Sequence, residues 1–217
     1  MGLFISQFNT VAEYNAVKNS LTKPHVSYIL ETDGVGFIPS ASTPSQHDYV
    51  DLGLPSGTKW ATMNVGASSE TDYGNYYQYG KGADDYSVTS GQSNYEGTET
   101  PLAASADTAV QVWGGQWHMP TSAQCQELID NTVYTWEENF NGSGINGGKF
   151  TAQNGNYVFF PAAGYMASSS LYGAGSYGYC WSSNSYGYES YVGYESYFLS
   201  LSSNVNNVIE YNVMYAC

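Results

Sequence analysis

Apolar residues in the first part of this chain predict one helix followed by two short strands. In the stretch VAEYNAVKNSL, residues 11–21, they recur every three or four positions, which predicts an amphipathic helix. Two short apolar runs follow, HVSYIL and VGFIP, and Asp33-Gly34 between them is a hairpin signal. The pattern predicts a small α/β-hairpin module over residues 1–38. The segment PSASTPSQH, residues 39–47, has the composition of a linker.

From residue 48 onward, short aromatic and apolar runs alternate with glycine, asparagine and serine, which predicts strands and turns. KFTA and YVFF flank the turn residues Asn154-Gly155 and predict a hairpin. The polar, glycine-rich stretch over residues 81–106 is expected to be a long surface loop. We therefore expect residues 48–217 to form one α+β domain.

One helix of this domain is predicted from WGGQWHMPTSAQCQELIDN. Thr121 is a good N-cap, and Gln124 three residues later completes a capping box. Ala123, Leu128 and Ile129 are expected to give the helix its apolar stripe.

The tract from Tyr177 to Asn207, YGYCWSSNSYGYESYVGYESYFLSLSSNVNN, consists mainly of tyrosine, serine, glycine and asparagine. That composition is typical of binding loops, where tyrosine buries a large area at a small loss of side-chain freedom. An aggregation-prone low-complexity tract without a specific ligand is the alternative. Trp181 and Ser182 within the tract are expected to belong to the scaffold.

The segment YFLSLSS near the end of the tract alternates like a strand. Tyr197, Leu199 and Leu201 are expected to face the core, and the residues between them are expected to face a ligand or, alternatively, only solvent. Five polar-tipped residues lie upstream of this segment: Asn184, Tyr186, Tyr188, Tyr191 and Tyr194. They cannot all be buried in the core, because each buried tyrosine hydroxyl needs a hydrogen-bond partner. With Cys180 added, the predicted ligand contacts are Cys180, Asn184, Tyr186, Tyr188, Tyr191, Tyr194, Phe198, Ser200 and Ser202.

Charge and composition exclude several functions. The chain has 19 acidic residues, 5 lysines and no arginine, a net charge of −14, so neither nucleic acid nor an anionic membrane surface is an expected partner. No apolar run is long enough to span a bilayer, and the N-terminus does not read as a secretory signal. The three cysteines, Cys125, Cys180 and Cys217, are expected to be free thiols, with a Cys180–Cys217 disulfide as the alternative.

Five blocks in order, VDLGLPSGTKWATMNVGA, YGNYYQYG, WHMPTSAQCQELI, FFPAAGY and YCWSSNS, resemble the C-type-lectin-fold proteins of gut Bacteroidales and their phages. These include the variable proteins of diversity-generating retroelements, which are related to the Fibrobacter paralogous domain family. The resemblance covers residues 48–217 and implies a C-type lectin fold. It also implies a variable region, about residues 177–207, in which adenine-specific mutagenesis rewrites asparagine codons. Such codons cannot yield Lys, Glu, Gln, Met or Trp. The tract contains no Lys, Gln or Met, and the resemblance implies that Trp181, Glu189 and Glu195 belong to the scaffold.

The chain departs from that family at His118, where arginine is usual, and it lacks the sequence triplets that bind sugar through calcium. Acidic residues at positions 84, 85, 96 and 99 match no metal loop and are expected to be solvated, so we expect no metal and no cofactor. The histidines are scattered, and no catalytic pattern is readable. The related fold includes formylglycine-generating enzymes with paired cysteines, for which Cys180 and Cys217 are the only candidate pair.

The resemblance therefore implies a non-enzymatic protein that binds a ligand or receptor, such as a phage tail or virion-associated adhesin. Two alternatives remain at this stage. One is a bacterial cell-surface adhesion protein with its export signal outside this sequence, and the other is a structural tail component. The expected partner is a protein or glycan receptor on a cell surface. Residues 1–38 are expected to mediate attachment or self-association, because so small a unit buries little surface alone.

Overall fold

A computed structural model describes residues 27–28, 39–40, 47–83, 100–167, 170–189, 193–204 and 206–212. For residues 27–28, 39–40, 186–189, 193–194 and 206–212 it describes the backbone alone. The chain divides into two units, Met1–Gln46 and His47–Cys217. The sequence places the start of the second domain at residue 48, one position from this division.

In the first unit, strand β1 (Ser27–Tyr28) pairs antiparallel with β2 (Pro39–Ser40). The register, Ser27 opposite Ser40, is centred between residues 33 and 34, where the sequence places its hairpin turn. Strand β2 falls on the first two positions of the predicted linker, so that linker does not begin at residue 39. The predicted helix over residues 11–21 lies outside the described residues.

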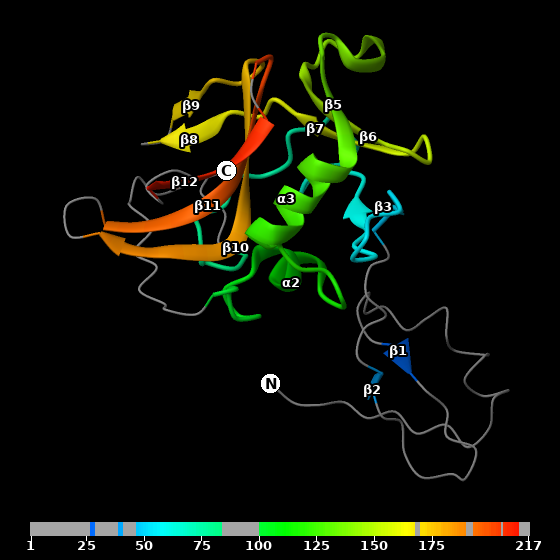
Figure 1. Cartoon of the computed structure of the whole chain (residues 1–217). Helices are drawn as coiled ribbons and strands as arrows, with labels where there is room; N and C mark the ends of the chain where they lie inside the picture. The colour runs from blue at the N-terminus through cyan, green and yellow to red at the C-terminus, as the bar shows by residue number, and fades with distance from the viewer. Residues whose placement is uncertain are drawn as a thin grey trace, which may run out of the picture. The chain divides into compact units, whose positions relative to one another are not determined.

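Helix α3 (Ser122–Asn131) begins where the sequence predicts. The Thr121 hydroxyl accepts from the Gln124 backbone N–H, and the Gln124 side chain accepts from Thr121, so the capping box is confirmed. The helix packs on strands from both three-stranded sheets, and Figure 1 shows it beside β10 and β11. Its buried residues are Cys125 and Leu128, whereas Ala123 is exposed, so the apolar stripe was misplaced by two positions at its start.

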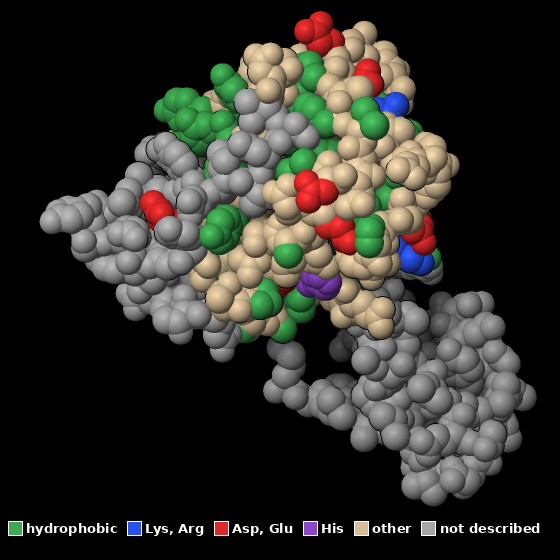
Figure 2. Space-filling model, in the orientation of Figure 1, with side chains coloured by type: hydrophobic (Ala, Val, Ile, Leu, Met, Phe, Trp, Pro, Cys, Tyr) green, Lys and Arg blue, Asp and Glu red, His purple; other side chains and the backbone are tan. Residues whose placement is uncertain are grey.

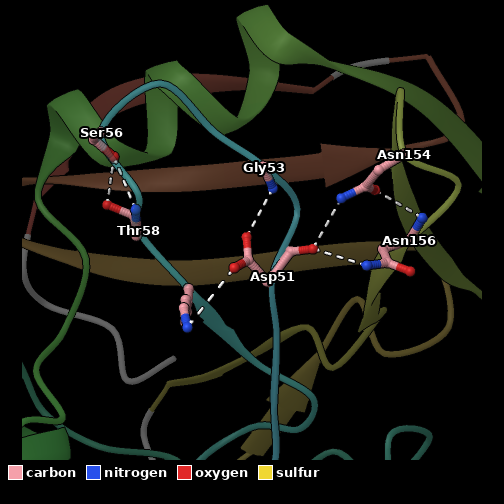
Figure 3. Close-up of polar contacts among 7 residues, drawn as sticks. Asp51, Gly53, Ser56, Thr58, Asn154 and Asn156 are labelled. Atoms are coloured by element: carbon pink, nitrogen blue, oxygen red, sulfur yellow. Dashed lines mark hydrogen bonds and ion pairs between the residues drawn. The ribbon is translucent and has the colours of Figure 1, made fainter.

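One sheet contains β5 (Thr132–Glu137), β6 (Gly147–Ala152) and β7 (Tyr157–Pro161), all antiparallel, with the 3₁₀ turn η3 (Phe140–Gly142) after β5. The β6–β7 hairpin turns at Asn154-Gly155, as the sequence predicts. Gly155 has φ +85°, a conformation that favours glycine. The Asn154 and Asn156 amides both donate to the Asp51 carbonyl, at 3.1 and 2.8 Å (Figure 3).

These bonds attach the sheet to the segment between β3 (Tyr49–Val50) and β4 (Trp60–Ala61). Within that segment the Asp51 carboxylate accepts from Gly53 N–H, and the hydroxyls of Ser56 and Thr58 bond each other (Figure 3). Ser56 also donates to Glu127 of α3, at 2.8 Å from its N–H and 2.6 Å from its hydroxyl. Residues 51–58 thus link the first sheet to α3.

The second sheet has the order β10 (Tyr177–Glu189), β11 (Gly193–Ser202) and β12 (Asn206–Asn212). A two-stranded hairpin, β8 (Tyr165–Ala167) and β9 (Ser170–Tyr172), precedes it. In the described part of the second unit, two α-helices accompany antiparallel strands gathered in small sheets, so the unit is α+β. None of its described helices is long and apolar enough to cross a membrane.

The sequence did not predict the shorter helix, α2 (Thr108–Trp113). Its N-cap is Asp107, a buried side chain that accepts from Val110 N–H and, with both carboxylate oxygens, from Met119 N–H. Thr108 donates to the Gly82 carbonyl at 2.8 Å. The Asp107 carboxylate that caps α2 therefore also bonds Met119, beyond the end of the helix. The spacing of apolar residues gives no signal of such a contact.

Candidate functional site

The tyrosine-rich tract forms one long antiparallel hairpin of β10 and β11. We call the paired residues 178–181 and 198–201 its inner half. Cys180, Leu199 and Leu201 pack in the main core cluster beneath α3 and the first sheet. Tyr179, Trp181 and Phe198 pack in a second cluster. Other members of the second cluster are Tyr79, Leu102, Ala106, Ala109 and Met119. The inner half is therefore covered on both faces.

This double coverage corrects part of the predicted site. Leu199 and Leu201 are fully buried, as expected, but Phe198 and Ser200 are buried as well, at 5% and 7% exposure. The predicted ligand face of β11 is wrong at these two positions, because the second cluster occupies that side. Ser202 is half-buried at the end of the strand, and its hydroxyl accepts from Asn204 N–H at 3.3 Å.

Trp181 is part of the scaffold, as the sequence predicts. Its indole is buried and donates to the Tyr77 carbonyl at 3.3 Å. Its ring meets Phe198 edge-on at 5.7 Å and Tyr79 at 5.4 Å between centroids. Ser182 beside it is fully buried. Tryptophan here contributes packing area to the second cluster.

Between Trp181 and Ser185 the pairing of β10 with β11 is interrupted by a register shift. The backbone of Ser183 explains the interruption, because its carbonyl accepts from Leu102 N–H and its N–H donates to the Pro120 carbonyl, both at 2.8 Å. Strand β10 therefore bonds two loops here instead of its neighbouring strand. We call residues 182–184 the bulge.

Asn184 ends the bulge, and its side-chain amide is used within the protein. The amide oxygen accepts from Ser122 N–H at 2.8 Å and from the Ser122 hydroxyl at 3.2 Å, at the first residue of α3. The amide nitrogen donates to the Thr100 hydroxyl at 3.0 Å, and the Asn184 carbonyl accepts from Ser196. Asn184 thus joins four segments of chain, a structural role that the sequence did not predict.

Beyond the bulge, β10 and β11 pair again; we call residues 185–189 and 193–196 the outer half. The last described pair of β11 with β12 is Glu195↔Asn212, and residues 213–217 lie outside the described residues. The outer half contains the pairs Tyr188↔Tyr194 and Glu189↔Gly193. Figure 1 shows β10 and β11 running to the left past the helices. Tyr186, Tyr188 and Tyr194 lie on these strands with only their backbone described. Tyr191 lies outside the described residues.

The two described thiols are poor nucleophiles. Cys125 is buried, and Cys180 is half-buried and packs against the main cluster, so Cys180 is not an exposed ligand contact. Both are free, and burial raises the pKa of each thiol to about 12, with the nearby Cys180 contributing to the shift at Cys125. A neutral, shielded thiol does not attack a substrate. Cys217 lies outside the described residues.

His118 is exposed, and its Nδ1 donates to the Met119 carbonyl at 2.9 Å. Within the part of the chain that the structure describes, no cluster of three or more His, Cys, Asp or Glu side chains is arranged to hold a metal. The acidic residues at positions 84, 85, 96 and 99 lie outside that part.

A group of exposed residues extends from the first residue of the predicted variable region, Tyr177, onto β9, which the sequence did not single out. Tyr172 and Tyr177 are each 47% exposed, and Leu171 beside them is 45% exposed. They come from β9 and the first residue of β10, next to the tyrosines at positions 165 and 179. The available signal was the spacing of aromatic residues around the small residues 168–170, which marks a hairpin.

Comparison with protein-family models, with curated proteins and with solved structures gives no match. The resemblance to C-type-lectin-fold variable proteins therefore stays a prediction made from the sequence blocks.

Proposed function

We propose that the chain is a non-enzymatic ligand- or receptor-binding protein of the C-type lectin fold. In this proposal it is a phage tail or virion-associated adhesin whose region 177–207 is diversified by a retroelement. The observation that carries the proposal is the division of the β10–β11 hairpin. Its inner half is covered on both faces by the two core clusters, whereas none of the outer-half residues with described side chains belongs to either cluster.

A diversified binding surface needs a backbone that stays fixed while its side chains vary, and the division of the hairpin is consistent with that need. The bulge is held by Leu102, Pro120 and Ser122 through hydrogen bonds that do not involve the outer residues. The outer half is therefore attached to a fixed point, which limits the loss of freedom on binding. Its tyrosines supply large contact area from side chains with only two torsions each. The receptor in this proposal is a protein or a glycan on a cell surface.

The proposal is tested by exchanging residues 186–194 for a serine- and glycine-rich segment of equal length. Binding of the labelled full chain to a panel of fixed gut Bacteroidales cells would be measured by flow cytometry. We expect the exchange to remove binding while the melting temperature stays close to that of the unmodified chain. Val133→Ser is the matched control, because Val133 is 67% exposed on β5, and this variant should bind normally.

Two outcomes contradict different parts of the proposal. Unchanged binding after the exchange would show that the outer half is not the receptor-binding surface. The retroelement is tested separately in genomic DNA, by a neighbouring reverse transcriptase gene and a near-identical template repeat of the 177–207 codons. If the genomic DNA contains neither the reverse transcriptase gene nor the template repeat, the diversification part of the proposal is wrong and the binding part still stands.

A further inference from the structure

The exposed aromatic group on β8, β9 and the start of β10 is a second surface, separate from the outer half of the hairpin. We call it the tyrosine patch; its residues are Tyr165, Leu171, Tyr172, Tyr177 and Tyr179. Figure 2 shows hydrophobic side chains gathered at the upper left of the molecule, where Figure 1 places β8 and β9. A contiguous exposed apolar patch on a protein surface often marks an interaction site.

Each exposed tyrosine rests on a more buried one. The ring of Tyr172 stacks on Tyr165 at 5.6 Å between centroids and 20° between planes. The ring of Tyr177 stacks on Tyr179 at 6.1 Å and 23°. Each of these rings is stacked on a neighbour and is still 47% exposed, so part of its surface is open to solvent. The patch therefore presents two partly exposed aromatic rings beside the aliphatic side chain of Leu171.

The backbone beneath the patch is fixed by hydrogen bonds. Tyr177 N–H donates to the Gly173 carbonyl at 2.9 Å, and the Tyr177 carbonyl accepts from Gly164 N–H at 2.8 Å. Gly173 has φ +69°, and a Cβ added there would lie 2.9 Å from the Tyr177 ring. On the inner side, Tyr179 meets the buried Phe198 at 5.3 Å. A surface held in this way loses little freedom when a partner binds.

The charge of the chain indicates what such rings would bind. An aromatic face attracts a cation, and the chain already uses its lysines in this way. Lys59 lies over the Tyr49 ring at 4.8 Å, and Lys149 lies over the Tyr157 ring at 4.5 Å. Among the residues that the structure describes, no lysine lies over Tyr172 or Tyr177. With 5 lysines, no arginine and a net charge of −14, the chain has few cations of its own to offer.

The same charge argues against other occupants. A second copy of the chain also carries −14, so two copies repel each other at long range. A basic partner is attracted by that field before any contact forms. We propose that the tyrosine patch docks a lysine- or arginine-bearing segment of another protein. The cationic groups lie against the exposed parts of the Tyr172 and Tyr177 rings, and an aliphatic stem packs on Leu171.

The test uses the full chain and an immobilised peptide of alternating lysine and leucine, at an ionic strength of about 0.15 M. Binding is measured by interferometry. A single exposed cation–π contact corresponds to a change of about 2- to 5-fold in affinity. We expect Tyr172→Ala and Tyr177→Ala each to weaken binding by about that factor, and the double variant to weaken it by the product. Tyr172→Phe keeps the ring and should bind within about 2-fold of the unmodified chain.

Tyr49→Ala is the matched control, because Tyr49 is 49% exposed and its ring already carries Lys59. It should leave peptide binding unchanged. Acetylation of the peptide lysines keeps their stems and removes their charge, and we expect binding at the patch to be lost. If Tyr177→Ala fails to fold, the test relies on Leu171→Ser and Tyr172→Ala, because these two residues are about half exposed.

Three results would overturn the proposal. The first is equal weakening by Tyr49→Ala and Tyr172→Ala, which would indicate attraction by net charge alone. The second is unchanged binding of the acetylated peptide. The third is binding to an array of neutral oligosaccharides that depends on Tyr172 and Tyr177 while peptide binding does not, which would assign the patch to sugars.

Discussion

The inner and outer halves of the β10–β11 hairpin belong to the same two strands but differ in what surrounds them. In the inner half, Trp181 and Phe198 lie opposite each other in the register and pack in the second cluster. Cys180 and Leu199, the next pair along, pack in the main cluster. In the outer half, Tyr188 and Tyr194 lie opposite each other in the register, beyond the bulge.

The bulge separates these two environments, and it shows how one strand can serve both. Residues 182–184 turn their backbone hydrogen bonds to Leu102 and Pro120, so the inner pairing stops before the outer pairing begins. A change in the outer half is therefore expected to act locally, whereas a change in the inner half acts on the stability of the whole domain.

The largest effect is expected for truncation of the inner aromatic residues. Trp181→Ala and Phe198→Ala each remove a buried ring from the second cluster, which costs about 3–5 kcal/mol in unfolding free energy. For a domain of this size the melting temperature should fall by roughly 6–20 °C. Thermal and denaturant unfolding measure it, with Val133→Ala on an exposed site as the control. A Phe198→Ala melt close to that of the unmodified chain would place Phe198 back on the surface.

Phe198 also shows why the sequence predicted some features and missed others. The capping box of α3 and the Asn154-Gly155 turn depend on residues within a few positions of one another, and both were predicted. The second cluster brings Tyr79, Leu102 and Met119 from distant segments onto the far side of β11. Alternation along one strand cannot reveal that both of its faces are covered. The resemblance to a known family indicated Trp181 as scaffold but gave no sign that β11 has two buried faces.

Asn184 was missed for a related reason. In the sequence it is one polar residue among serines and tyrosines, which is the composition of a binding loop. Its structural role depends on Ser122, 62 residues away, and on Thr100, 84 residues away. A side chain that bonds such distant groups leaves no periodic signal in its own neighbourhood.

The second effect is a loss of stability at alkaline pH. The pKa of Cys125 and of Cys180 is raised to about 12 by burial. Burial also raises the pKa of Tyr134 to about 12, although its hydroxyl donates to the Ser202 carbonyl at 2.7 Å. Because the folded state holds these protons more tightly than the unfolded chain, stability is full below about pH 9 and falls as pH rises toward 12.

Each pH unit in that window lowers the unfolding free energy by up to about 1.4 kcal/mol per thiol. Denaturant midpoints measured from pH 7 to 11 should therefore decline above pH 9 in the unmodified chain. Cys125→Ala removes one titrating group and should make the decline shallower, even though its midpoint at neutral pH is lower. A midpoint that stays constant up to pH 11 would contradict the burial of these thiols.

The third effect concerns the bulge. Asn184→Ala leaves Ser122 N–H at the start of α3 and the Thr100 hydroxyl without the amide, which should cost about 1–3 kcal/mol. Asn204→Ala is the matched control, since Asn204 is exposed in the turn after β11, and its loss should be within about 0.5 kcal/mol. Hydrogen exchange of the outer-half amides should also rise in Asn184→Ala more than in the control. Equal melting and equal exchange in the two variants would show that Asn184 does not fix the outer half.

The smallest effect on stability is expected in the outer half itself. Tyr188 and Tyr194 are opposed in the register, and truncating one member of such a cross-strand pair changes stability by about 0.2–1 kcal/mol. Because the bulge separates this pair from the inner half, the loss should stay local: amide exchange near residues 188 and 194 should rise while the global melt changes by only a few degrees. Tyr188→Ala, Tyr191→Ala and Tyr194→Ala would be compared with Trp181→Ala in the same melting experiment. If the tyrosine variants melt as low as Trp181→Ala, the outer half is part of the core, and both its independence and its proposed role in binding are wrong.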